Sequence, residues 1–180
     1  MLIAPSAAPS FGDVRLRPFE FRDVAMVRDL ATDSYVPLIG TLAASATDGE
    51  ARDWIERQHD RWARETGYSF CVAHERDDRA LGNIGLWLAP IAHGRATAGY
   101  GIAPAARGHG YAAQALTALT AFAWTMPALH RVELYVEPWN IASIRAAERA
   151  GYRLEGSLRS HQEIGGRRVD MQLYAAVRPA

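Results

Sequence analysis

Apolar and polar residues in the first half of the chain follow two different spacings. Residues 14–18 alternate apolar and polar and end at a proline, which predicts a short first strand. Apolar residues recur at helical spacing in residues 22–31 and again in residues 48–65, where Asp48 can cap the helix. Residues 33–47, with a proline, a glycine and many small side chains, predict a loop with at most one helical turn.

Three strand-like segments follow, at residues 68–74, 80–89 and 96–103, with short polar turns between them. Short connections favour antiparallel neighbours, so we expect a meander. Helical spacing then returns over residues 110–126, and a β-branched and aromatic strand follows at residues 131–136. The strand, helix and strand between residues 96 and 136 should therefore form a right-handed parallel crossover.

The C-terminal part predicts one short helix and two strands. Residues 140–150 form the helix, which a glycine closes, and residues 152–157 and 168–177 form strands joined by a polar hairpin. We expect one α/β (α+β) domain over residues 13–180, with a mostly antiparallel sheet of six to seven strands and helices on both faces. Residues 1–12 are rich in Ala, Pro and Ser and predict a flexible N-terminal tail.

Composition narrows the function classes. The 20 Lys and Arg residues balance the 20 Asp and Glu residues, so charge gives no reason to expect nucleic acid or a membrane surface as a partner. No segment approaches the roughly 18 apolar residues of a membrane helix. Cys71, the one cysteine, lies in an apolar run and predicts a buried thiol in a protein of the reducing cytoplasm. The histidines show no metal-ligand spacing, so we expect no metal.

The most informative stretch is a glycine-rich turn between a predicted strand and a predicted helix. Free backbone amides at a helix start attract anions, Gly108 and Gly110 let the backbone approach a phosphate, and Arg107 can add a charge-assisted contact. A plain strand–turn–helix junction carries such glycines equally well. Residues 108–113 also match the dinucleotide pattern G-x-G-x-x-A, but a meander precedes them and no acidic residue follows at the expected distance. A dinucleotide-binding oxidoreductase is therefore kept as an alternative, whereas a P-loop is excluded because no Gly-Lys-Ser/Thr is present.

The sequence Arg107-x-x-Gly110-x-Ala112 resembles the acetyl-CoA signature R/Q-x-x-G-x-G/A of the GCN5-related N-acetyltransferase (GNAT) superfamily. Further stretches resemble its subgroup of ribosomal-protein N-terminal acetyltransferases, of the RimJ/RimL type. These are residues 99–102, 131–136, Asn140-x-x-Ser143, 148–156 and 170–174. The resemblance covers roughly residues 13–177.

The resemblance implies central strands that splay apart and hold acetyl-CoA between them. Pantetheine would pair with backbone groups of Gly101, Ile102 and Ala103, and an amide near Ile102 would stabilise the tetrahedral oxyanion. The pyrophosphate would lie on the amides of a six-residue run, namely Arg107, Gly108, His109, Gly110, Tyr111 and Ala112. The His109 side chain itself is expected to be exposed. The reaction implied is transfer of an acetyl group from acetyl-CoA to a primary amine, by direct attack on the thioester.

Ser143 is the expected acid for the departing thiolate. It can equally be an ordinary serine at a helix start, because Asn140, three residues earlier, is a natural N-cap. Asn140 can both cap the helix and bond to pantetheine. The loop at residues 33–47, Trp87 and Trp139 are expected near the acceptor cleft.

The general base is less defined by the sequence. Glu133 is the candidate, beside Glu137 and Glu163, and each of these can instead be a paired surface charge. Many subgroup members carry an acid where this chain has Thr97, so activation through ordered water stays open, as does a non-catalytic acyl-CoA-binding sensor. The acceptor can be a protein or peptide N-terminus or a small amine, and a homodimer is compatible with the family.

Overall fold

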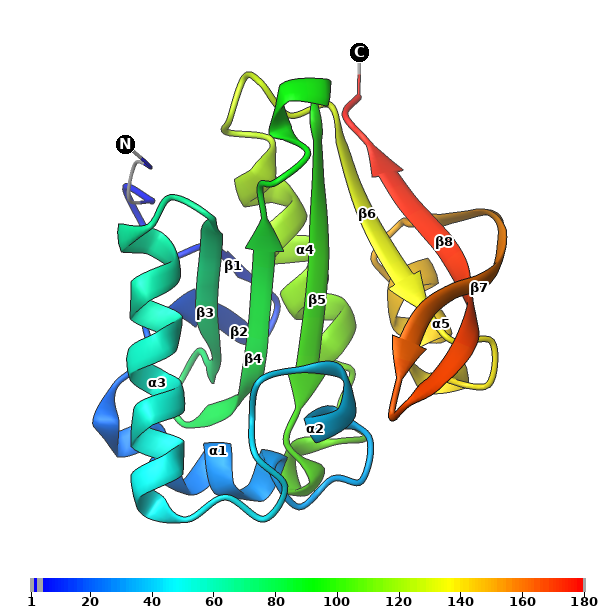
Figure 1. The fold of residues 1–180 in the computed structure, drawn as a ribbon. Coiled ribbons are helices and arrows are strands. Elements are labelled where there is room, and N and C mark those ends of the chain that lie inside the picture. The colour runs from blue at the N-terminus through cyan, green and yellow to red at the C-terminus, as the bar shows by residue number, and fades with distance from the viewer. Residues whose placement is uncertain (1, 3–4, 180) are drawn as a thin grey trace.

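The computed structural model describes residue 2 and residues 5–179 of the 180-residue chain. They form one eight-stranded sheet in the order β1-β2-β3-β4-β5-β6-β8-β7 (Figure 1). The strands are β1 (Ser10–Phe11), β2 (Val14–Arg17), β3 (Gly67–His74), β4 (Ala80–Trp87), β5 (Arg95–Ile102), β6 (Arg131–Val136), β7 (Arg153–Ile164) and β8 (Arg167–Val177). The helices are α1 (Val24–Leu30), α2 (Val36–Ile39), α3 (Asp48–Ala63), α4 (Tyr111–Ala123) and α5 (Ile141–Arg149).

The pairing confirms the predicted topology. Strands β2 to β5 form an antiparallel meander. Strands β5 and β6 are parallel, and α4 connects them along the chain. The hairpin of β7 and β8 continues the sheet, with β8 antiparallel to β6. The sheet is thus mostly antiparallel with one parallel crossover, as expected for an α/β domain of this kind.

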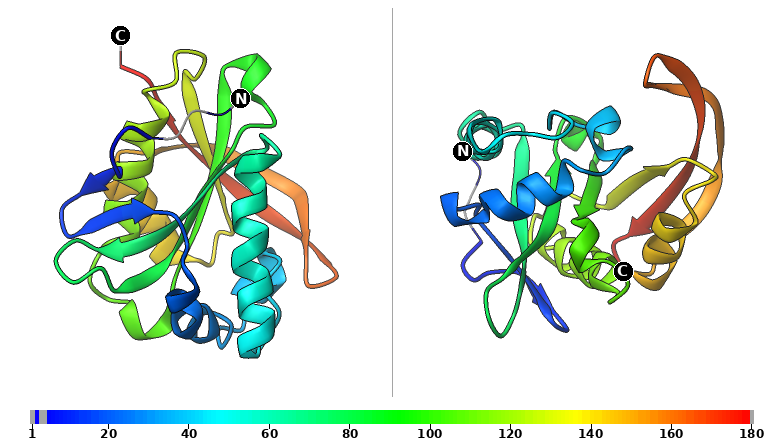
Figure 2. Two further views of the ribbon diagram at one scale, coloured as in Figure 1. Left: turned by 90° about the vertical axis from the view of Figure 1, so that its left-hand side faces the viewer. Right: turned by 90° about the horizontal axis from the view of Figure 1, so that it is seen from below.

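Helices cover both faces of the sheet, as predicted (Figure 2). On one face, α4 buries Leu116 and Leu119 against the strands in the larger core cluster. On the other face, α1 and α3 bury a second cluster that includes Leu30, Trp54 and Ile55. Each helix turns one apolar stripe inward, which is the pattern that identified them in the sequence.

The structure differs from the sequence predictions at three element boundaries. The predicted tail contributes β1, because Gly12 turns the chain at a φ of +60° and Ser10 and Phe11 pair with β2; the sheet therefore has eight strands rather than six to seven. The last hairpin is longer than predicted, because polar residues continue the pairing out to Ile164 and Arg167. Thr47, not Asp48, caps α3, since Thr47 is extended and exchanges hydrogen bonds with Glu50 in a capping box.

Candidate active site

The sheet opens between β5 and β6. The two strands pair only from Arg95 with Arg131 to Thr97 with Glu133. Beyond that point β5 continues to Ile102 and β6 to Val136, but among the described residues they no longer pair with each other, and Figure 1 shows them diverging downwards. The expected splayed strands are therefore present.

Backbone groups of β5 alternate between the paired side and the open side. The amide of Ala103 donates to the carbonyl of Leu81, which lies just beyond the paired part of β4, at 2.9 Å. Because hydrogen-bonded positions alternate along an antiparallel ladder, Gly101 also faces β4, whereas Tyr100 and Ile102 face the opening. The amides of Gly101 and Ala103 are therefore turned toward β4, so of the three predicted pantetheine contacts only Ile102, together with Tyr100, offers a backbone amide to the opening.

A turn with bare amides lies at the foot of the opening. Gly108 and Gly110 adopt φ angles of +86° and +78°, and a Cβ at either position would meet no atom within 4 Å. Within the described chain, the amides of residues 108–113 donate no hydrogen bond, and the first paired amide of α4 is that of Gln114, to the carbonyl of Gly110. The amide of Arg107 donates to Pro104 at 3.3 Å, so the free run begins one residue later than predicted. Six such amides, with the positive end of the helix dipole behind them, have the geometry that can bind an anion.

The Arg107 side chain ties this turn to the segment before α2. Its Nε donates to the carbonyl of Ile102 at 2.9 Å, and its terminal nitrogen lies 2.7 Å from a carboxylate oxygen of Asp33. Burial acts to raise the pKa of Asp33, but the amides of Val36 and Tyr35 together with Arg107 outweigh it and hold this pKa below its usual range. Arg107 thus fixes the turn and the α2 segment relative to each other.

His109 is exposed, as expected, and stacks on Tyr111 at 5.4 Å between ring centroids. Its side chain therefore borders the amide run without covering it.

The start of α5 forms the opposite wall of the opening. Asn140 is the N-cap, as its Oδ1 accepts from the amide of Ser143 at 3.1 Å, and this leaves its side-chain NH₂ group available. No partner is found for the Ser143 hydroxyl among the described residues, while the Ser143 carbonyl accepts from the hydroxyl of Tyr100 at 3.2 Å. Burial raises the pKa of Tyr100, which keeps this donor protonated.

These elements enclose a cleft of about 510 Å³. It is lined by β5, the turn, the first turn of α4, the α2 segment and one side of α5. Of the predicted site residues it contains Gly101, Ile102, Arg107, Gly108, Gly110, Tyr111, Ala112, Asn140 and Ser143. Predicted site residues from segments about forty residues apart in the sequence therefore line the same cleft.

Glu133 lies elsewhere. It is buried on β6, and its carboxylate accepts from Arg131 Nε at 2.7 Å and from the Tyr135 hydroxyl at 3.1 Å, with Arg95 3.5 Å away. It does not line the cleft. Both of its oxygens are engaged, so this residue is poorly placed to accept a proton from a substrate.

Next to the cleft lies Tyr35, which the sequence did not single out, together with Glu137, which it named as a possible base beside Glu133. The Tyr35 hydroxyl faces the buried Glu137 side chain, and burial followed by this carboxylate raises the pKa of Tyr35. The Tyr35 ring also meets Trp139 edge-to-face at 4.9 Å. The α2 segment is thereby held across the opening to the end of β6. Tyr35 and Glu137 are about a hundred residues apart, so their contact leaves no local pattern in the sequence. Trp139 and the loop that contains Tyr35 were nevertheless both expected near the acceptor cleft.

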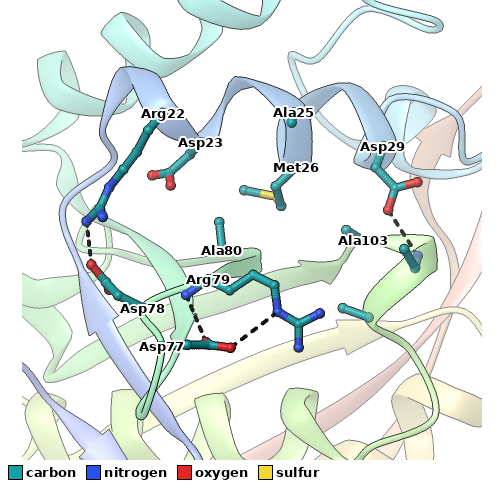
Figure 3. Close-up of a pocket in the computed structure, with 12 residues that line it drawn as sticks. Arg22, Asp23, Ala25, Met26, Asp29, Asp77, Asp78, Arg79, Ala80 and Ala103 are labelled. Atoms are coloured by element: carbon teal, nitrogen blue, oxygen red, sulfur yellow. Dashed lines mark hydrogen bonds and ion pairs between the residues drawn. The ribbon is translucent and has the colours of Figure 1, made fainter.

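A second cavity of about 440 Å³ lies between α1 and the β3–β4 turn (Figure 3). Its charged groups engage one another or the backbone: Arg22 pairs with Asp78, Asp77 accepts from the amide of Arg79, and Asp29 accepts from the amide of Ala105 at 3.0 Å. The last contact holds the short turn that precedes Arg107. We therefore infer that the residues lining this cavity stabilise the turn next to the cleft.

The sequence matches the acetyltransferase (GNAT) domain over residues 13–153. The chain belongs to the GNAT acetyltransferase family. It is 26% identical over 163 residues to an uncharacterized N-acetyltransferase, p20, of Bacillus licheniformis, covering 91% of this chain and 92% of that protein. It is 31% identical over 129 residues to the probable N-acetyltransferase YjcK of Bacillus subtilis, covering 71% of each chain.

Among solved structures, RimJ of Mycobacterium smegmatis in complex with a CoA disulfide superposes with a TM-score of 0.78 at 24% identity, covering 94% of this GNAT chain and 84% of RimJ. The expected family and fold are confirmed, and the family's reaction is acetyl transfer from acetyl-CoA to an amine. The bare amides, their two open glycines and the cleft leading from them fit the diphosphate and pantetheine of this cosubstrate.

Two absences apply to residue 2 and residues 5–179 only. No helix there is both long and apolar enough to cross a membrane. No cluster of three or more His, Cys, Asp or Glu side chains lies together there as metal ligands would.

Proposed function

We propose that this GNAT enzyme binds acetyl-CoA in the β5–β6 cleft, with its pyrophosphate on the amides of residues 108–113, and acetylates a primary amine. The observation that carries the proposal is the run of six unpaired amides at the foot of the opened strands. Pantetheine would follow the open side of β5 toward the point where the strands meet. There a β5 amide that faces the opening would polarise the thioester carbonyl and stabilise the oxyanion, whereas the amide of Ile102, five residues further along β5, would bond to pantetheine.

Ser143 is assigned as the proton donor to the departing thiolate. Asn140 already caps α5, so the Ser143 hydroxyl is not needed for the helix and lines the cleft with no protein partner among the described residues. The amide group of Asn140 that the cap leaves available would bond to pantetheine. This assignment gives each of the two residues one distinct task.

Amine activation is assigned to ordered water rather than to Glu133. An α-amine has a pKa near 8, so roughly a tenth of it is neutral at pH 7 and little assistance is needed. Glu133 instead holds Arg95, Arg131 and Tyr135 at the point where β5 and β6 part. We assign it a positioning role in that cluster.

The acceptor proposed is the α-amine of a protein or peptide. A small primary amine is the alternative acceptor, and it would react in the same way. The resemblance of the sequence to the RimJ/RimL-type subgroup of ribosomal-protein N-terminal acetyltransferases supports the first form, and the fold is shared with RimJ. A cytoplasmic location remains part of this proposal. A homodimer is compatible with it and is tested by the mass of the protein in solution.

Thermal unfolding with acetyl-CoA, CoA and NAD, followed by thiol release with a panel of amines, tests this function. A ligand at 100 times its dissociation constant stabilises the protein by about 2.7 kcal/mol, so acetyl-CoA and CoA should raise the Tm and NAD should not. Absence of any stabilisation by acetyl-CoA would refute the cleft assignment. Binding without thiol release for every amine would favour an acyl-CoA sensor.

A further inference from the structure

Arg61 is a half-buried arginine that lacks an acidic partner. It lies on α3, and its guanidinium carbon is 5.4 Å from the centre of the Trp87 ring on β4. Among the described residues no carboxylate comes within ion-pair distance of it. Burial, followed by repulsion from Arg57, lowers the pKa of Arg61, in agreement with a cation that the fold does not compensate.

Two glycines make room for the aromatic ring beneath this cation. A Cβ on Gly99 of β5 would lie 2.9 Å from the Trp87 ring, and one on Gly85 of β4 would lie 3.0 Å from it. The indole therefore lies over both glycines, on the face of the sheet opposite α4. Arg61 stacks above it, as a guanidinium does on an aromatic face.

This stack lies beside the point where the strands part. Trp87 pairs with Thr97, and Thr97 is the last residue of β5 that pairs with β6. An acceptor amine attacking at the opening would have Trp87 about two strand spacings away, or ~10 Å. Figure 1 shows α3 beside β3, and Figure 2 shows it on the face of the sheet opposite α4.

The arginines nearest the point where the strands part have acidic partners, whereas Arg61 has none among the described residues. Arg95 and Arg131 share Glu133, and Arg131 also pairs with Glu155. Arg57, one helical turn before Arg61, donates to the carbonyl of Thr41 at 3.2 Å instead of to an acid. Two like charges at this spacing destabilise a helix by a few tenths of a kcal/mol, so the fold alone gives no reason for the pair.

We propose that the acceptor amine carries an anionic group, and that Arg61 binds this group over the Trp87 ring. The proposal rests on the proposed function, because it needs an amine at the opening. The distance requires a carboxylate several bonds from the amine, as on an acidic second residue of a peptide or on a longer amino acid. The carboxylate of an α-amino acid is too close to its own amine to span the gap, and polycationic amines are disfavoured.

Matched acceptors test this directly. Peptides beginning Ala-Asp and Ala-Asn differ only in charge, and an ω-amino acid with its methyl ester forms a second pair. Wild-type enzyme should show kcat/KM at least about tenfold higher for the charged member of a pair, the value expected for one charge-assisted contact. A preference confined to the peptide pair identifies a peptide as the acceptor, and a preference confined to the ω-amino acid pair identifies a small molecule.

Two variants locate the effect at Arg61. Arg61→Met keeps the aliphatic stem on the indole but removes the charge, so it should abolish the preference while leaving the KM for acetyl-CoA and the rate with neutral amines unchanged. Arg61→Lys should retain part of it. Arg64→Met is the matched control, because Arg64 lies on the exposed end of α3 beside Asp60 and should leave the preference intact.

The possible results distinguish a failure of the anion site from a failure of the proposed acetyl transfer. Equal use of charged and neutral acceptors by the wild type, or an unchanged preference in Arg61→Met, overturns the anion site while acetyl transfer stands. If Arg61→Met fails to fold, the wild-type preference must still fall as ionic strength rises, and a salt-independent preference overturns the proposal. Absence of thiol release with every amine removes the proposed function, and the anion site with it.

Discussion

Strand β5 meets its two neighbours in different ways. It pairs with β4 at six positions, from Gly82 with Ile102 to Trp87 with Thr97. It pairs with β6 at only three. On the closed side the strands approach so closely that a Cβ on Gly82 would lie 2.1 Å from the carbonyl oxygen of Gly101.

The open side is held by side chains instead of a ladder. Tyr100 reaches the start of α5, Arg107 reaches Asp33, and Tyr35 reaches Glu137. Backbone groups that a continuous sheet would consume are thereby left for a ligand. One side of β5 therefore contributes to the stability of the sheet, and the other side offers groups that can bind a ligand. Substitutions at the open side should change activity more than stability, and those on the closed side should do the reverse.

Removing the Ser143 hydroxyl should give the largest effect on activity. We expect Ser143→Ala to lower kcat by about 100-fold, because loss of a general acid typically costs that much, with the KM for acetyl-CoA and the Tm unchanged. Steady-state thiol release and thermal unfolding measure both. Ser157→Ala, on exposed β7, is the control and should behave as wild type. A kcat near the wild-type value would indicate that water, and not Ser143, protonates the departing thiolate.

The amide run can be tested with a matched pair of glycines. Gly110 and Gly151 have φ angles of +78° and +84°, and a Cβ at either would meet no atom within 4 Å. Alanine at each should therefore cost about 1–2 kcal/mol of backbone strain. Only Gly110→Ala should also weaken acetyl-CoA binding, by about tenfold or more, since it disturbs amides that face the ligand. Equal affinities of the two variants in calorimetric titrations would disprove the phosphate site.

What the sequence could predict follows the same division. The turn at Arg107 and the cap at Asn140 are local, so residue types and spacing are enough to identify them from the sequence. The meander and the crossover followed from short connections and from the change of apolar period. The one missed strand, β1, has only two residues, which is too short for a period to register.

The acceptor side could not be predicted in this way. Trp87 and Trp139 were expected near it, but their partners Arg61 and Tyr35 are brought to them by packing between distant elements. Glu133 was assigned to chemistry from its position on β6, whereas its partners Arg95 and Tyr135 emerge only from the folded sheet. Side-chain pairing across strands depends on register and twist, which the spacing of single residues does not encode.

Tyr100 offers a smaller test of how the open side is held. Its hydroxyl donates to the carbonyl of Ser143, so Tyr100→Phe should let the start of α5 shift and lower kcat severalfold, with about 1 kcal/mol of stability lost. Tyr152→Phe is the control, because it removes a 2.7 Å contact with Thr120 on α4 that lies outside the cleft. It should lose similar stability and keep kcat. Equal kcat in both variants would mean that Tyr100 does not position Ser143.

The closed side should respond to acid rather than lose activity. Burial acts to raise the pKa of Asp78, but ion pairs with Arg15, Arg17 and Arg22 outweigh it and hold this pKa well below its usual range. A carboxyl whose pKa is lowered by folding stabilises the protein above its unfolded pKa, near 4, and loses that contribution as the pH falls further.

We therefore expect Asp78→Asn to lower the free energy of unfolding by about 1 kcal/mol at pH 7, a modest value because the pairs are partly exposed. Its stability should decline less steeply than that of the wild type below pH ~4. Denaturant titrations across this range measure the difference, with exposed Asp60→Asn as the control. The kcat at pH 7 should not change, because the cluster lies on the far side of β5 from the cleft. An equal acid response in Asp78→Asn and wild type would show that these arginines do not stabilise the fold through Asp78.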